Sequence, residues 1–98
     1  MTQIKSIPAD EAMDYLSEND CFLLDVRDPM EFESGHLEGA VNLPLLSLHL
    51  KVHDLPLEKE IVVYCAHGVR SAKAAHYLMG NGFNKVAHIS GGIEEMNV

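Results

Sequence analysis

Apolar residues gather in short β-branched runs, and the longest of these runs predict buried strands. Cys21–Val26 is almost unbroken in apolar character, and Ile61-Val62-Val63-Tyr64-Cys65 is the clearest strand of the chain. Such runs are typical of a parallel sheet, whose strands are buried on both faces. Shorter runs predict three further strands, over Ile4–Ile7, Ala40–Leu43 and Val86–Ile89.

Segments with helical spacing lie between these strands. Ala12, Met13 and Leu16 form an apolar stripe shortly after Pro8, a residue that suits the first turn of a helix. Ser71–Met79 is a strong helix, because its small and apolar residues recur on one side. Shorter helical segments are expected after Asp28-Pro29, over Leu45–Val52 and after Gly91-Gly92. Strands that alternate with helices predict an α/β fold, a small parallel sheet of about five strands with helices on both faces.

The length and composition favour one domain. The chain has 98 residues, without linker, repeat or low-complexity segment, so a single domain over residues 1–98 is expected. No apolar run approaches the ~20 residues needed to span a bilayer. Met1–Asp10 lacks the apolar stretch of a secretory signal. These features predict a cytoplasmic protein that has no membrane partner.

The charge pattern bears on the partners. The net charge of −8 disfavours a nucleic-acid partner. Residues 1–60 hold 13 acidic and 4 basic side chains, whereas residues 61–93 hold no Asp or Glu. The basic residues of that acid-free stretch are Arg70, Lys73 and Lys85. A site built there would not repel an anion, although a chance gap in the charge pattern is the simpler alternative.

The two cysteines, Cys21 and Cys65, are too few for a disulfide framework and lack zinc-finger spacing. Cys21 starts a strand and Cys65 ends one, so in a parallel sheet they lie farther apart than the ~7 Å that a disulfide allows.

His49 and His53 are four residues apart, but no third ligand lies near them, which favours solvated surface histidines. No metal or cofactor is expected, and the sequence indicates no partner for His88.

Cys65 stands between the clearest strand and the strongest helix, with a glycine-containing loop after it. Sites in open α/β sheets form at the carboxyl ends of strands. A loop that curls into a helix turns several N–H groups and the positive end of the helix dipole toward one point. A sulfur held there is stabilised as the nucleophilic thiolate, with a pKa below the ~8.5 of a free thiol.

Arg70 closes this loop, and its planar guanidinium suits an oxyanion such as a sulfonate or phosphate. His67, inside the loop, could contact a substrate or acceptor. A cysteine followed five residues later by an arginine is by itself a weak pattern, which favours a buried cysteine that ends a strand and an arginine that caps surface carbonyls. Its position between a strand and a helix favours the functional interpretation.

Several motifs, in order along nearly the whole chain, resemble the rhodanese-like domain family. The segment from Cys65 to Ser71, with the letters CAHGVRS, resembles the active-site loop of rhodanese-type sulfurtransferases. The sequence departs from the family pattern at Met96, where an aromatic residue commonly follows the Gly-Gly pair. The other matching segments are Asp25-Val26-Arg27, Glu31-Phe32, Gly35-His36-Leu37-Glu38-Gly39-Ala40, Asn42-Leu43-Pro44, Tyr77-Leu78, Gly82-Phe83, Val86 and Gly91-Gly92.

This resemblance implies a rhodanese-like fold and a sulfurtransferase that carries sulfur as a persulfide on Cys65. Arg70 would bind a small anionic donor such as thiosulfate, and the acceptor would be a thiol, cyanide or an acceptor protein. Arg27 would pair with Glu31 or a neighbouring carboxylate and hold the scaffold. Asp25, Arg27 and Ser71 are the expected supporting residues. The residues whose N–H groups would cradle the persulfide are Ala66, His67, Gly68, Val69 and Arg70.

Three alternatives to this function remain open. A cysteine-loop phosphatase or arsenate reductase is the main rival, but related phosphatases have one more residue between cysteine and arginine, which widens the loop for a tetrahedral phosphate. A binding module that keeps the fold without chemistry is the second, although such copies often lose the cysteine that is present here. A persulfide relay to another protein is a third alternative.

Overall fold

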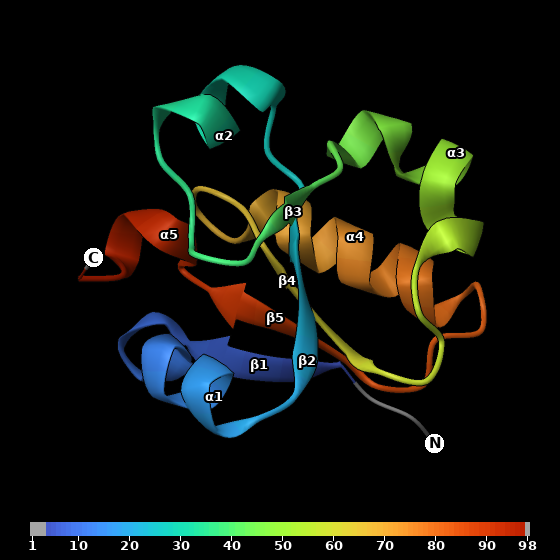
Figure 1. Cartoon of the computed structure of the whole chain (residues 1–98), viewed down its shortest axis with the longest axis horizontal. Coiled ribbons are helices and arrows are strands. Elements are labelled where there is room, and N and C mark those ends of the chain that lie inside the picture. The colour runs from blue at the N-terminus through green and yellow to red at the C-terminus, as the bar shows by residue number, and fades with distance from the viewer. Residues whose placement is uncertain (1–3, 98) are drawn as a thin grey trace.

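The computed structural model describes residues 4–97 and contains a five-stranded parallel sheet (Figure 1). The strands lie in the order β1-β5-β4-β2-β3, and every pairing in the described part is parallel. Their bounds are β1 (Lys5–Pro8), β2 (Cys21–Asp25), β3 (Val41–Asn42), β4 (Glu60–Tyr64) and β5 (Val86–Ser90). The predicted α/β fold with about five strands is therefore confirmed.

Helices cover both faces of the sheet, as predicted. One face packs against α4 (Val69–Met79) and α3 (Leu48–Lys51), with Val63 of β4 and Leu78 of α4 in the same buried cluster. The other face packs against α1 (Ala12–Glu18) and α5 (Gly92–Glu95). The remaining helix, α2 (Pro29–Ser34), follows β2 beyond the carboxyl end of the strand. No helix among residues 4–97 combines the length and apolar character needed to cross a membrane.

Two local expectations differ from the structure. Pro8 ends β1 with extended backbone (φ −60°, ψ 145°), and α1 begins only at Ala12, after the single 3-10 turn Ala9–Glu11. Proline is tolerated there because β1 is an edge strand, where a missing N–H leaves no ladder partner unpaired. The helix predicted over Leu45–Val52 is split into α3 and flanking 3-10 turns, because Ser47 and Lys51 depart from helical backbone angles.

A buried ion pair ties the end of β2 to the loop after α2. Asp25 is fully buried and Arg27 is 4% exposed. The Arg27 Nη2 atom donates to Asp25 at 2.8 Å and to the Gly35 carbonyl at 2.7 Å. The Arg27 guanidinium also lies over the Tyr64 ring, 5.6 Å from its centroid. Two strands and the following loop therefore share one charged contact.

We expect the Asp25→Ala variant to lose about 3–5 kcal/mol of unfolding free energy, because it leaves the Arg27 charge buried and unpaired. Urea unfolding measures this loss. The matched control is Asp20→Ala, which removes an exposed ion pair with Lys59 at 3.4 Å and is expected to cost less than about 1 kcal/mol. Equal losses in the two variants would contradict the structural role of the buried pair.

Candidate active site

Cys65 lies at the end of β4, and its sulfur is enclosed by the loop that leads into α4. The residue is 1% exposed. The backbone N–H groups of Gly68 and Ser71 donate to Sγ at 3.1 and 3.2 Å. The expected cradle of residues 66–70 is thus represented by Gly68, and the second N–H comes from Ser71, one residue beyond it. The first turn of the helix, as well as the loop, holds the sulfur.

These donors set the ionisation of the thiol. Burial by itself raises the pKa of Cys65, since it removes water from the charged form. Hydrogen bonds from the Ser71 side chain and from the N–H groups of Ser71, Gly68 and His67 outweigh burial, and the pKa of Cys65 lies below its ordinary value. The pKa of Cys21, in contrast, is raised, by burial first and then by Glu60 and Asp20. Both cysteines are free.

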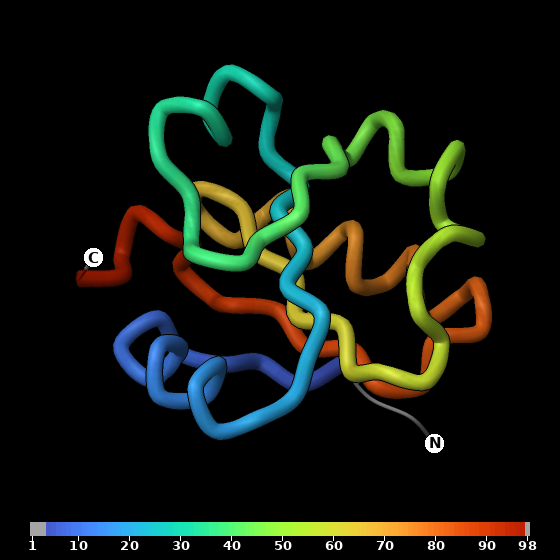
Figure 2. The backbone as a smooth tube through the Cα atoms, viewed as in Figure 1, coloured from blue at the N-terminus to red at the C-terminus, as the bar shows by residue number. Residues whose placement is uncertain are grey.

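Glycines make the tight course of the loop possible. Gly68 precedes α4 with φ +104°, a conformation that side-chain-bearing residues rarely adopt. Gly92 has φ +68°, and a Cβ atom built on it would lie 2.2 Å from the Ala66 carbonyl oxygen. This close approach lets the start of α5 dock against the loop, where Ile93 N–H donates to the Cys65 carbonyl and Glu94 N–H to the Ala66 carbonyl. Figure 2 shows the loop and the C-terminal segment side by side.

Arg70 closes the loop, but its guanidinium is already paired. Nη1 and Nη2 donate to the two carboxylate oxygens of Glu31 at 2.8 and 3.0 Å. Both side chains are about one-third exposed. The hydrogen bond from Arg70 is the main cause that lowers the pKa of Glu31 to about 2, so this carboxylate is charged at neutral pH. Arg27 was expected to pair with Glu31 or a neighbouring carboxylate, and the structure shows the second of these, Asp25.

The Ser71 side chain links the loop to β5. Its Oγ atom donates to the Gly68 carbonyl at 3.1 Å and lies 3.1 Å from His88 Nδ1. The sequence indicated no partner for His88. The signal that could have found it is the alternation of β5, which places His88 on the same face of the sheet as Val86, under α4.

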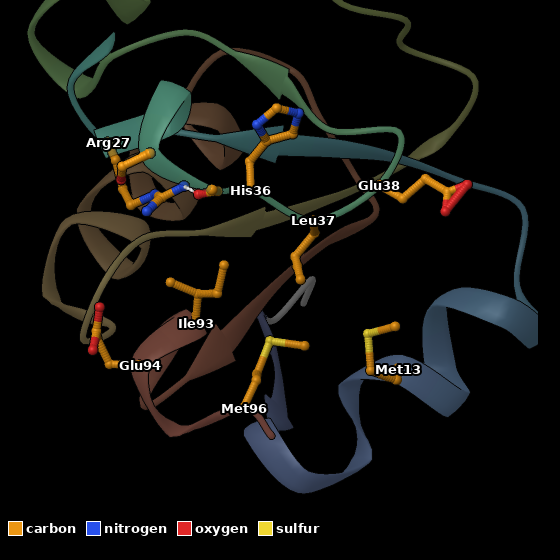
Figure 3. Close-up of a pocket in the computed structure, with 10 residues that line it drawn as sticks. Met13, Arg27, His36, Leu37, Glu38, Ile93, Glu94 and Met96 are labelled. Atoms are coloured by element: carbon orange, nitrogen blue, oxygen red, sulfur yellow. Dashed lines mark hydrogen bonds between the residues drawn. The ribbon is translucent and has the colours of Figure 1, made fainter. Parts of the chain in front are cut away.

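A groove of about 510 Å³ lies beside the loop, on the opposite face of the sheet from α4 (Figure 3). Leu37, Ile93 and Met96 point toward one another in its floor, and Glu38 and Glu94 stand on its sides. Cys65 does not line this groove. Arg27 and His36 also line the groove, so its walls carry both basic and acidic side chains.

The site residues predicted from sequence thus fall into two groups, those that contact the sulfur and those whose side chains lie elsewhere. Gly68 and Ser71 contact the sulfur directly. The His67 and Val69 side chains are exposed, and Arg70 is engaged with α2. Among residues 4–97 no group of three or more His, Cys, Asp or Glu side chains could hold a metal ion.

The fold and this cysteine loop together match a known family. The family described as "Rhodanese-like domain" matches residues 8–97, and the chain belongs to it. The thiosulfate sulfurtransferase GlpE of Pseudomonas syringae pv. syringae is 43% identical over 94 residues, which cover 96% of this chain and 88% of that protein. The expected rhodanese-type sulfurtransferase is confirmed by the family match and by this nearly full-length relative.

Solved structures agree with the fold. A rhodanese-related protein from Thermoplasma volcanium is 34% identical, with a TM-score of 0.82 over 92% of this chain and 87% of that chain. A protein from Rhodopseudomonas palustris, described as a possible tyrosine phosphatase, is 29% identical, with a TM-score of 0.77 over 91% of this chain and 76% of that chain. The same fold therefore accompanies both descriptions, and the choice between them depends on the loop.

We expect the Gly92→Ala variant to be destabilised by about 2–5 kcal/mol, because it adds an overlap with the Ala66 carbonyl to the cost of a left-handed backbone. The matched control is Gly39→Ala, at φ +84° with nothing within 4 Å of the new Cβ, which is expected to cost only about 1–2 kcal/mol. Urea unfolding compares the two variants. An equal cost would show that the close approach contributes nothing.

We expect Cys65 to ionise at a lower pH than Cys21, because hydrogen bonds lower one pKa and burial raises the other. The rate of iodoacetamide modification is measured against pH and read separately for each cysteine by peptide mass. The pH midpoint is the informative quantity, since the 1% exposure of Cys65 slows modification at every pH. A midpoint for Cys65 at or above the ~8.5 of a model thiol would refute the electrostatic argument.

Proposed function

We propose that this chain moves the outer sulfur of thiosulfate, or of a similar anionic donor, to a thiol or cyanide acceptor through a persulfide on Cys65. The observation that carries the proposal is the pair of backbone N–H groups, from Gly68 and Ser71, that converge on Sγ. The GlpE relative from Pseudomonas syringae is named for the same activity, which supports the choice of donor.

In the first step the Cys65 thiolate attacks the outer sulfur of thiosulfate. A bond forms between Sγ and that sulfur, while the sulfur–sulfur bond of thiosulfate breaks and its electron pair leaves with sulfite. Cys65 becomes a persulfide anion, so charge is conserved. The lowered pKa of Cys65 increases the fraction of attacking thiolate relative to an ordinary thiol at the same pH.

In the second step the thiolate form of the acceptor attacks the outer sulfur of the persulfide. A new sulfur–sulfur bond forms, the bond to Sγ breaks, and Cys65 returns to a thiolate. Cyanide as acceptor yields thiocyanate by the same displacement. The N–H groups of Gly68 and Ser71 stabilise the thiolate at the beginning and at the end of the cycle.

Arg70 serves this proposal as the residue that binds the anionic donor. Its pairing with Glu31 uses one edge of the guanidinium and leaves other N–H groups free for a second anion. Because Glu31 cancels its charge, Arg70 orients the donor by hydrogen bonds more than by long-range attraction. The other loop residues, Ala66, His67, Gly68 and Val69, complete the proposed binding loop through their backbone.

The supporting residues are Asp25, Arg27 and Ser71, and of these three Ser71 contacts the sulfur. The buried pair of Asp25 and Arg27 holds the loop that follows α2. Glu31, which lies in α2, in turn orients Arg70. Ser71 donates directly to Sγ through its N–H group. We propose these three residues as the support of the site.

A phosphatase is the weaker alternative. The loop places only four residues between Cys65 and Arg70, and its N–H groups already contact the Sγ atom itself. A tetrahedral phosphate needs several of these donors for its own oxygens.

A cytoplasmic setting fits the proposal, because free thiols are kept reduced there and thiol acceptors are abundant.

We expect thiosulfate to add one sulfur atom to the protein, observed by intact-mass spectrometry and removed by a thiol reductant. The Cys65→Ser variant is expected to lose the adduct, and the matched Cys21→Ser variant to keep it. An adduct that survives in the Cys65→Ser protein would sink the assignment. Cys65-dependent hydrolysis of an aryl phosphate would instead favour the phosphatase.

We expect the Arg70→Ala variant to lose about tenfold to hundredfold in kcat/KM for thiosulfate, since charge-assisted hydrogen bonds contribute about 1.5–3 kcal/mol. Lys73→Ala, which removes an exposed cation one helical turn later, is the matched control and should change little. Combining Arg70→Ala with Glu31→Gln separates the lost contact from repulsion by the unpaired carboxylate. Unchanged kinetics in a folded Arg70→Ala protein would remove Arg70 from the site.

A further inference from the structure

An apolar cleft of about 290 Å³ lies between α4 and the segment that runs from the 3-10 turn Leu45–Ser47 into α3. Figure 1 shows α3 and α4 as neighbours on one side of the sheet. The cleft is separate from the groove of Figure 3, which lies on the opposite face. Its lining residues are Leu45, Leu48, His49, Lys73 and Tyr77.

Exposed apolar side chains continue from this cleft onto the surface. Leu46 and Leu50 are 87% and 69% exposed, and each directly follows a residue of the cleft lining. Val69, one helical turn before Lys73, is 65% exposed. Single exposed apolar residues are common on soluble proteins, but several of them around an apolar cleft indicate a surface that another molecule covers.

The charges at the cleft are basic, although the protein as a whole is acidic. Residues 39–53 and 61–93, which supply both walls, hold no Asp or Glu. Lys73 is exposed and forms no ion pair within residues 4–97, and the exposed His49 lies on the other wall. Exposed carboxylates farther away are screened beyond about 8–10 Å at physiological salt. The cleft therefore suits a carboxylate that binds beside an apolar side chain.

The cleft begins close to the cysteine loop. Cys65 packs in the buried cluster on the α4 side of the sheet. Lys73 follows Ser71, whose N–H contacts Sγ, by two residues, or about 3 Å along the helix axis. A typical protein–protein interface covers about 800 Å² on each partner, a patch roughly 30 Å across. A protein that reaches Sγ from the α4 side therefore covers the cleft as well.

We propose that this cleft is the docking surface for a protein that accepts the persulfide sulfur, with an apolar side chain between α3 and α4 and a carboxylate on Lys73. The proposal rests on the proposed function, because it names the class of molecule that receives the sulfur. The thiolate of this protein attacks the outer sulfur of the Cys65 persulfide. A sulfur–sulfur bond forms on the acceptor, the bond to Sγ breaks, and Cys65 leaves as a thiolate. Cyanide is too small to reach the cleft and does not depend on it.

Three cysteine peptides of equal length serve as probes in place of the acceptor. The first carries leucines and glutamates around its cysteine, the second has lysine for each glutamate, and the third has serine for each leucine. The readout is the rate constant of sulfur transfer from the persulfide-loaded protein, normalised to the rate of each peptide with a small disulfide. We expect the first peptide to react about fivefold faster than either of the others. Salt at about 0.5 M should remove its advantage over the second peptide but not over the third.

Lys73→Glu tests the charge of the cleft, and Lys85→Glu is its matched control. Both replace an exposed lysine by glutamate, but Lys85 precedes β5, at the edge of the sheet opposite to the cysteine loop. Lys73→Glu should reverse the preference between the first two peptides, and Lys85→Glu should keep the wild-type order. An unchanged order in a folded Lys73→Glu protein, or an equal change in both variants, overturns the proposal. If Lys73→Glu does not fold, Lys73→Met must still abolish the preference for glutamate.

Amide chemical shifts test docking without sulfur transfer. The leucine–glutamate peptide with serine in place of its cysteine should shift amides of α3 and α4 around His49, Lys73 and Tyr77, and the lysine version should not. Shifts of the same amides with protein concentration alone would show that a second copy of this chain occupies the cleft, which overturns the proposal.

The two proposals fail in different ways. Failure of the wild-type protein to pass sulfur from thiosulfate to cyanide would reject the persulfide function and leave the chemical-shift test in force. Normal transfer to cyanide without any preference among the three peptides would reject the docking surface alone.

Discussion

The convergence of two backbone N–H groups on the sulfur of Cys65 is the contact on which the rest of the site depends. Gly68 and Ser71 reach Sγ only because the chain reverses within four residues, and Gly68 supplies the left-handed turn that this requires. A buried thiolate without such donors would be strongly disfavoured by desolvation. The donors are fixed by the backbone of a helix that is itself packed on the sheet, so they need no reorganisation when charge develops on the sulfur.

The electrostatics of the site follow from dipoles more than from net charge. The protein carries −8, and the nearest arginine of the loop is neutralised by Glu31 through two short hydrogen bonds. Stabilisation of the thiolate therefore comes from N–H groups that act within hydrogen-bond distance. Exposed carboxylates elsewhere are screened beyond about 8–10 Å at physiological salt. An acidic protein can thus lower the pKa of a cysteine without a strongly positive pocket.

The sheet and the place of Cys65 follow from local pattern, whereas the side-chain partnerships do not. The strand before Cys65 is predicted because its residues are β-branched and apolar, and the fold needs little beyond the alternation of such strands with helices. The pairing of Arg70 with Glu31 joins residues 39 positions apart, so it depends on the position of α2 relative to the cysteine loop. The contact of Ser71 with His88 likewise exists only because β5 lies beside β4. Periodicity assigns a residue to a face but does not select its partner.

The groups that hold the sulfur are buried, whereas other side chains of the same loop are exposed at the surface. The sulfur receives its donors from the backbone and from the buried Ser71, whereas the His67 and Val69 side chains are exposed. Side chains at those two positions can therefore change without moving the N–H groups that hold the thiolate. Buried residues behind the loop are constrained in the opposite sense, because Gly92 touches the Ala66 carbonyl and leaves no room for a Cβ atom. The position and ionisation of the sulfur thus depend on buried residues of the fold. The molecules that approach the sulfur meet the exposed side chains of the loop.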